Sequence, residues 1–380
     1  MSAYFSALSD ALKTAGILQP CLVLDIDRLD RNIALVKGRL DPGLAVRLVD
    51  KSLACLPLLA HIGKALGANH VMSFHPPVSE AVLKAFPDAD LLYGKPMPVG
   101  AARAALVKAD ADYWSRVCWL IDTQERLAEY GALATELGIE LRIAFEIDVG
   151  LHRGGFASPE SLSKALSALP SRLCCEGVMA YEAHAPHIPG LFGGPVKALA
   201  KASAQATAFV ACLGADQRRI LNIGGSKTAL LHHGGVANEV SMGSAFVLPS
   251  DFDTPGLEGF LPAAFIATPM LKVVEPMLPG PPAVTRLLQA LGRFPRKGCY
   301  LYGGKWMAEP VFPEGMRTNG LLGLSSNQQF MGLPADATAR PGDHAFLRPT
   351  QSEAVLQQFG SIAVFSGGRI ADRWPALPMG

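Results

Sequence analysis

The alternation of short apolar runs with helical segments is the feature that most constrains the fold of this chain. About eight runs of strand length follow one another over roughly 210 residues, separated by segments rich in Ala and Leu. The runs cover residues 43–49, 70–74, 90–93, 117–122, 141–147, 175–181, 219–223 and 240–246. A buried strand followed by a helix, repeated in this way, predicts a parallel (β/α)8 barrel of TIM type.

The texture of the sequence changes after about residue 250. Proline and glycine become frequent, and short β-like runs replace the alternation, at 264–268, 299–302, 344–348 and 361–365. We therefore expect a barrel over residues 26–250 and a mostly β domain over residues 251–380. We expect the helix and strand of residues 1–25 to pack on this β domain.

Composition narrows the class of protein. Hydrophobic residues make up 49% of the 380 positions and charged residues 18%, which is typical of a well-buried globular protein. Lys+Arg number 34 and Asp+Glu 33, so no basic field marks the chain for nucleic acid. The seven cysteines form no CxxC spacing, and no apolar run approaches the roughly 20 residues that cross a bilayer. These features predict a cytoplasmic protein with reduced thiols and no membrane segment.

Lys51 ends the first predicted barrel strand, on the rim where barrel enzymes place their chemistry. A partly desolvated lysine amine titrates lower and can form a Schiff base with an aldehyde. The alternative is a solvated lysine in a loop.

A second polar cluster, residues 146–155, follows the predicted strand 141–147. The acids Glu146 and Asp148 meet Arg153, which stands beside two glycines. Such an arginine can donate a charge-assisted hydrogen bond to an oxyanion, and its alternative role is a structural ion pair with Glu146 or Asp148.

A third cluster contains two Gly-Ser turns at late barrel strands. Gly224, Gly225 and Ser226 follow one strand, and Gly243 and Ser244 lie at the next. Backbone amides in such turns can converge on phosphate, and late barrel strands are the usual phosphate position. Either turn taken alone is more often only a turn.

An aldehyde-reactive lysine, an arginine for an oxyanion and a two-turn phosphate site together describe a pocket for pyridoxal 5'-phosphate. Tyr181, His184 and His187 end the sixth strand and would face the same cavity. The tyrosine can hydrogen-bond the cofactor ring, and the histidines are candidate acid–base groups.

These residues resemble the fold-type III pyridoxal-phosphate enzymes, in particular the D-threonine aldolase / D-serine dehydratase branch of the alanine racemase superfamily. The most specific match is Glu146-Ile147-Asp148-Val149-Gly150 with Arg153 and Gly155. The other matching segments are 20–33, 47–51, Tyr181, 224–226 and 243–244, in the family's order.

The resemblance implies an alanine racemase-like fold and a homodimer with a shared site. It implies Lys51 as the cofactor-bearing lysine, Arg153 near the phenolic oxygen and Tyr181 near the ring nitrogen. It places Gly224, Gly225, Ser226, Gly243 and Ser244 at the phosphate. His187 matches the family's histidine after that tyrosine.

The sequence departs from this branch where the branch carries a Pro-His-x-Cys metal motif. Here the matching stretch reads Pro349-Thr350-Gln351-Ser352, and an upstream acidic-histidine segment is replaced by residues 325–329. Hydroxyls and amides are poor ligands for zinc or manganese compared with imidazole and thiolate. We therefore predict no catalytic metal, and expect Thr350, Gln351 and Ser352 to bind the substrate.

The predicted activity is a lyase that cleaves a D-configured or α-substituted β-hydroxy amino acid by retro-aldol chemistry. His187 or His184 would remove the β-hydroxyl proton. Three alternatives stay open: an amino-acid racemase with Lys51 and a tyrosine such as Tyr302 as its two bases, a D-serine or 3-hydroxyaspartate dehydratase, and a non-catalytic carrier of the cofactor.

Overall fold

The computed structural model describes residues 2–377, apart from the side chains of residues 2, 111 and 114. The described chain forms two compact units. One contains residues up to Asn32, Val247–Asp251 and Phe260–Leu377, and the other contains Ile33–Phe246 and Phe252–Gly259. The predicted fold class, a (β/α)8 barrel with a mostly β second domain, is confirmed.

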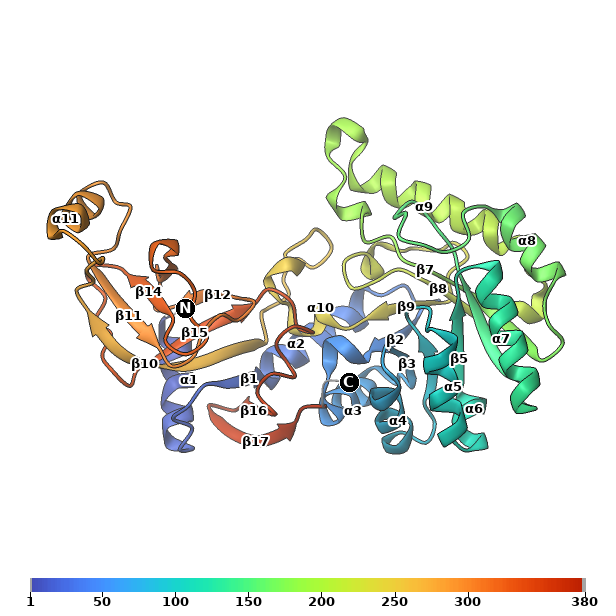
Figure 1. Cartoon of the computed structure of the whole chain (residues 1–380), viewed down its shortest axis with the longest axis horizontal. Helices are drawn as coiled ribbons and strands as arrows, with labels where there is room; N and C mark the ends of the chain where they lie inside the picture. Colours follow the sequence, from blue (N-terminus) through green and yellow to red (C-terminus); the bar gives the residue numbers. More distant parts are fainter. Residues whose placement is uncertain (1, 378–380) are drawn as a thin grey trace. The chain divides into compact units, whose positions relative to one another are not determined.

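Eight parallel strands close the barrel in sequence order, from the first to the last (Figure 1). They are β2 (Ala45–Val49), β3 (His70–Ser73), β4 (Asp90–Tyr93), β5 (Val117–Ile121), β6 (Leu141–Glu146), β7 (Leu173–Ala180), β8 (Ile220–Ile223) and β9 (Glu239–Met242). The helices between and around them are α2 (Ile26–Arg39), α3 (Leu56–Leu66), α4 (Pro76–Ala85), α5 (Val99–Lys108), α6 (Ala111–Arg116), α7 (Gln124–Leu137), α8 (Pro159–Ser167) and α9 (Gly194–Val210).

Two barrel connections differ from the sequence prediction. The strand expected over residues 240–246 ends at Met242, because the chain turns at Gly243 into the short helix α10 (Ser244–Val247). Between β8 and β9 the structure has a short 3-10 turn, η5 (Ala229–Leu231), in place of an α-helix.

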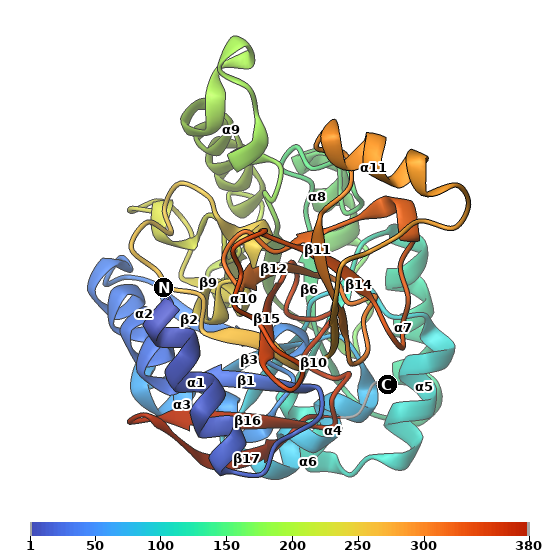
Figure 2. The ribbon, with the colours of Figure 1, turned by 90° about the vertical axis from the view of Figure 1, so that its left-hand side faces the viewer.

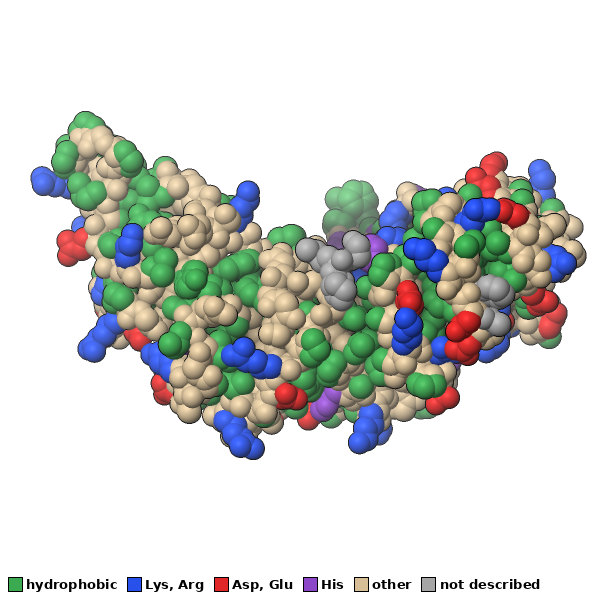
Figure 3. Space-filling model, turned by 60° about the horizontal axis from the view of Figure 1, so that its bottom comes forward, with side chains coloured by type: hydrophobic (Ala, Val, Ile, Leu, Met, Phe, Trp, Pro, Cys, Tyr) green, Lys and Arg blue, Asp and Glu red, His purple; other side chains and the backbone are tan. Residues whose placement is uncertain are grey.

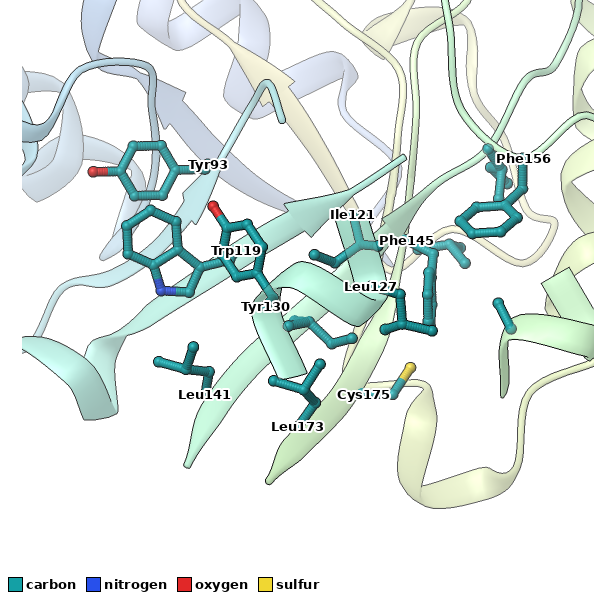
Figure 4. Close-up of a cluster of buried hydrophobic side chains, with 14 of the residues drawn as sticks. Tyr93, Trp119, Ile121, Leu127, Tyr130, Leu141, Phe145, Phe156, Leu173 and Cys175 are labelled. Carbon is teal, nitrogen blue, oxygen red and sulfur yellow. The ribbon is translucent and has the colours of Figure 1, made fainter. Parts of the chain in front are cut away.

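The barrel wall packs against its helices through a buried aromatic cluster (Figure 4). The ring of Trp119 on β5 stacks on that of Tyr93 on β4, with centroids 4.5 Å apart and planes at 16°. Tyr130 from α7 also contacts the indole. Such aromatic pairs contribute roughly 0.5–1.5 kcal/mol beyond their buried area, so this cluster fixes α7 against the wall.

The barrel interior contains an apolar layer and a charged layer. The apolar layer consists of Val49, Met72, Leu92, Cys118, Leu120, Ala144, Met179 and Ile220. Toward the amino ends of the strands, the fully buried Arg47 donates to Glu239 at 2.6 and 2.9 Å and to Asp90 at 3.1 Å. Burial opposes ionisation of Glu239, but the neighbouring Arg47 guanidinium lowers the pKa of this carboxyl to about 2.

The β unit is built on a sheet in the order β13-β14-β11-β10-β1-β16-β17, with β15 pairing to β10 and β12. Its strands are β1 (Cys21–Asp25), β10 (Ala264–Val274), β11 (Lys297–Leu301), β12 (Ala308–Phe312), β13 (Arg317–Thr318), β14 (Phe330–Leu333), β15 (His344–Pro349), β16 (Ser361–Ser366) and β17 (Arg369–Pro375). The helix α1 (Ser2–Thr14) lies across this sheet (Figure 2). It buries Phe5 between Phe265 and Phe346. A further helix, α11, spans Pro282–Ala290.

On the face shown in Figure 3, lysine and arginine side chains are interspersed with aspartate and glutamate. This distribution agrees with the near-balanced charge of the sequence. Within residues 2–377 we find no helix that is long and apolar enough to span a membrane.

Candidate active site

Lys51 lies just beyond the carboxyl end of β2, in the 3-10 turn η1 (Asp50–Leu53). Its Nζ lies 4.7 Å from the centroid of the Phe74 ring, at the end of β3. The same ring packs directly on Gly94, which follows β4: a Cβ at this position would lie 2.5 Å from Phe74 Cζ. The lysine amine is therefore half-buried on an aromatic face at the functional rim of the barrel.

Asp50, the residue before Lys51, is 1% exposed. Within the described part of the chain, no hydrogen bond of good geometry reaches either oxygen of its carboxyl group. Burial raises the pKa of Asp50 to about 7, although the Ser73 hydroxyl and the backbone amide and charge of Lys51 act in the opposite direction. A buried titratable acid thus stands next to the candidate cofactor lysine, which the sequence did not show.

The loop after β6 carries the predicted arginine. The Arg153 guanidinium lies 3.9 Å from Glu146 Oε1 and 5.3 Å from the centroid of the Tyr181 ring. Burial raises the pKa of Glu146, whereas Arg153 opposes this rise. The loop folds back closely at Gly155 (φ +91°), where a Cβ would lie 2.8 Å from the Glu146 carbonyl oxygen. Arg153 is therefore held between an acid and the predicted ring-contacting tyrosine, with its side chain still 56% exposed.

The two Gly-Ser turns lie side by side, and the second of them contacts the Lys51 turn. The backbone amide of Gly243 donates to Ser226 Oγ at 2.9 Å, which links the turns. A Cβ on Gly243 would lie 2.8 Å from Ser52 Cβ, so this glycine packs against η1. A Cβ on Gly225 would lie 2.4 Å from Tyr181 Cε2. These contacts bring both turns, Tyr181 and the Lys51 turn to one rim of the barrel.

The two candidate histidines have different surroundings. His184 packs against the loop after β6, where a Cβ on Gly150 would lie 3.1 Å from its Nε2, and its buried Nδ1 has no hydrogen-bond partner among the described residues. His187 is exposed, and its Nε2 lies 3.1 Å from the amine of Lys227. His187 is thus tied to the first Gly-Ser turn, and His184 to the Arg153 loop.

The three predicted substrate-binding residues belong to the β unit, immediately after β15. Thr350 Oγ1 donates to the Met307 carbonyl, and Gln351 Nε2 donates to Asp251. Ser352 is buried. Their role toward a substrate stays a prediction.

The structure adds one pair to the rim that the sequence analysis missed. Glu182, directly after Tyr181, is fully buried and lies 2.8 Å from Nε2 of the buried His232. The only signal in the sequence was an acid next to the predicted ring-contacting tyrosine, and nothing in it connected that acid to a histidine 50 positions away.

The described residues contain no group of three or more His, Cys, Asp or Glu side chains arranged to hold a metal ion. The absence of a catalytic metal stays a prediction.

Comparison with known proteins identifies the family. The alanine racemase N-terminal domain matches residues 24–251 of this chain. The chain belongs to the alanine racemase family. This confirms the resemblance inferred from the motifs around Lys51 and Arg153.

Among the relatives of this alanine racemase family member is the 3-hydroxy-D-aspartate aldolase of Paracoccus denitrificans, strain Pd 1222. It is 29% identical over 252 residues, which cover 62% of this chain and 62% of that protein. The matched part thus spans about three-fifths of the curated relative.

Several solved structures share the fold. The D-threonine aldolase of Filomicrobium marinum superposes with a TM-score of 0.74 at 17% identity, over 94% of this chain and 97% of that one. The D-threo-3-hydroxyaspartate dehydratase of Delftia sp. HT23 gives 0.66 at 16% identity, over 95% and 98%. An alanine racemase of Clostridium difficile 630 gives 0.68 at 14% identity, over 95% and 99%.

Proposed function

We propose that this protein is a pyridoxal-phosphate-dependent lyase that cleaves a D-configured or α-substituted β-hydroxy amino acid between Cα and Cβ. The observation that carries the proposal is the meeting of the Lys51 turn, Tyr181 and both Gly-Ser turns on one rim of the barrel. The curated relative is an aldolase for 3-hydroxy-D-aspartate, and a D-threonine aldolase shares the fold, which supports this choice of substrate class.

The rim suits the proposed cofactor. Glycine at 225 and 243 lets the two turns pack directly against Tyr181 and Ser52, where a side chain would clash. Their amides donate to Thr228 Oγ1 and Ser226 Oγ in the structure, so a bound phosphate would take the place of these hydroxyl acceptors or join them. Lys51 would hold the aldehyde carbon through Nζ. Arg153 would donate to the phenolic oxygen, and Tyr181 would contact the ring nitrogen.

When bound, pyridoxal phosphate supplies an electron sink for the electrons of the Cα–Cβ bond. The protein must supply a base for the β-hydroxyl proton, and we propose His187, with His184 as the second candidate. Loss of that proton lets the oxygen form a carbonyl, so that an aldehyde leaves and Cα takes up a proton. Thr350, Gln351 and Ser352 are proposed to hydrogen-bond the substrate, without a metal ion.

We also propose that the protein acts in the cytoplasm as a homodimer. All seven cysteines carry free thiols in the structure, which agrees with a reducing compartment.

The cofactor is tested by the visible absorbance of purified protein and by borohydride reduction followed by peptide mapping. We expect the label on Lys51, loss of the absorbance in Lys51→Ala, and no change in Lys64→Ala, an exposed lysine on α3. A label on another lysine, or none, would refute the proposal.

The reaction is tested with D-threonine, D-phenylserine and 3-hydroxy-D-aspartate. We expect an aldehyde and glycine. Keto acid with ammonia would show a dehydratase, solvent deuterium at Cα without cleavage would show a racemase, and no turnover of a broad amino-acid panel would favour the carrier.

A further inference from the structure

Two consecutive residues at the end of β7 contact two consecutive glycines at the end of β8. Tyr181 packs on Gly225, as described above. A Cβ on Gly224 would lie 3.0 Å from His232 Nε2 and 3.3 Å from Glu182 Oε1. Gly224 has φ +111°, so its backbone conformation also favours glycine. The first Gly-Ser turn therefore rests on Tyr181 at one glycine and on the Glu182–His232 pair at the other.

The Glu182–His232 pair is enclosed. Glu182 is 0% exposed and His232 is 7% exposed. The imidazole satisfies Oε1 at 2.8 Å, whereas Oε2 has no hydrogen-bond partner among the described residues. The histidine ring is the donor in this hydrogen bond when the carboxyl is ionised, because an ionised carboxylate only accepts hydrogen bonds.

The surroundings of His232 are apolar, and this raises the cost of losing its hydrogen bond to Glu182. Because the β8–β9 connection has no α-helix, an apolar groove of about 440 Å³ opens between α9 and residues 231–237, and His232 lines it. Leu199, Ala206 and Val236 are among the other lining residues. In such a setting a carboxylate that loses its partner keeps an uncompensated charge.

We propose that Glu182 and His232 are a positioning pair that shapes the Gly224–Ser226 turn, with the imidazole hydrogen-bonding the buried carboxylate beside it, so that the turn accepts a phosphate monoester. The inference rests on the proposed cofactor role of this turn. A phosphate monoester carries close to two negative charges at neutral pH, and an unpaired carboxylate in contact with the turn would repel it.

The test compares the affinity of the cofactor-free full chain for pyridoxal phosphate with its affinity for pyridoxal, which lacks the phosphate. His232→Leu removes the hydrogen-bond donor. We expect this variant to lower the affinity for pyridoxal phosphate at least about tenfold, but the affinity for pyridoxal less than about threefold. His232→Gln keeps an amide donor at a similar reach, and we expect nearly normal affinity. Inorganic phosphate, used as a competitor, should lose potency in parallel in His232→Leu.

A double variant separates the effect of the Glu182 charge from the effect of the shape of the Gly224–Ser226 turn. Adding Glu182→Gln to His232→Leu removes the stranded charge, so phosphate affinity should rise above that of His232→Leu alone. His233→Leu, an exposed neighbour, is the matched control and should change neither ligand.

The inference would be overturned if His232→Leu lowered the affinity for both ligands equally, or if the double variant bound pyridoxal phosphate less tightly than His232→Leu alone. Either result would leave the cofactor assignment in place. Failure of the unaltered protein to bind pyridoxal phosphate at Lys51 would instead refute the proposed function, and the inference with it.

Discussion

Asp50→Asn should stabilise the cofactor-free barrel at neutral and alkaline pH. The Asp50 carboxyl is 1% exposed and has no hydrogen bond of good geometry within the described chain, and burial raises its pKa to about 7. In the unfolded chain an aspartate titrates near ~3.9. Between these two values the folded protein binds the proton more strongly, so stability falls as the pH rises from about 4 to about 7.

The size of this effect follows from the two pKa values. A difference of about 3 units corresponds to about 4 kcal/mol, at ~1.4 kcal/mol per unit. The amide that replaces the carboxyl places donors in the same buried site, at a pH-independent cost of about 1–3 kcal/mol. We therefore expect a gain of roughly 1–3 kcal/mol at pH 8 and a loss of similar size at pH 4.

The assay is urea unfolding of cofactor-free protein, followed by hydrogen exchange of the β2–β9 amides. Exchange at these amides reports on the barrel alone, and not on the second compact unit. Asp88→Asn, an exposed aspartate before β4, is the matched control. A stability difference that does not change with pH, or a larger gain at pH 4 than at pH 8, would show that Asp50 is not held protonated by burial.

Three further outcomes are expected. Gly225→Ala should weaken pyridoxal phosphate binding at least about tenfold in an equilibrium titration, because the new Cβ would meet the Tyr181 ring at 2.4 Å, and unchanged affinity would contradict the packing described. Arg47→Met should destabilise the barrel by about 3–5 kcal/mol in urea, and adding Glu239→Gln should recover part of that loss. The Glu239 contribution is complete above a pH of about 4.3 and is lost as the pH falls toward 2, so the stability difference between the unaltered protein and Arg47→Met should narrow over this range. Chelator treatment should leave turnover unchanged, and metal analysis that finds a stoichiometric ion would show that the comparison of Thr350 and Ser352 with the metal motif is wrong.

The barrel could be predicted because its signal is local and repeated. Each strand is a short apolar run with a helical segment after it, and a closed parallel sheet needs such runs to be buried on both faces. The β unit was harder: β12, β13, β14 and β17 were not predicted. Pro310 interrupts β12, and β13 is only the pair Arg317–Thr318, so neither presents an unbroken β-forming run of strand length.

The candidate site also contains residues that could be predicted from the sequence and residues that could not. The placement of Lys51, Arg153 and the Gly-Ser turns on one rim was predictable, because each follows its own strand and barrel geometry gathers strand ends, while their roles stay predictions. Asp50 and the Glu182–His232 pair were not predictable, because their importance comes from burial and from long-range contact. The sequence does not indicate whether an acidic side chain will be solvated or will be buried beside a hydrogen-bond partner.

The pairing of β2 with β9, which closes the barrel, joins residues that the ribosome adds to the chain at well-separated times. Arg47 on the first strand and its partner Glu239 on the last are 192 positions apart. While the chain is being synthesised, this guanidinium therefore has only water, the Val71 carbonyl and Asp90 as partners, until the final strand leaves the ribosome. A nascent chain cut anywhere before β9 keeps an open sheet with two bare edges, and is the form for which chaperones would be needed.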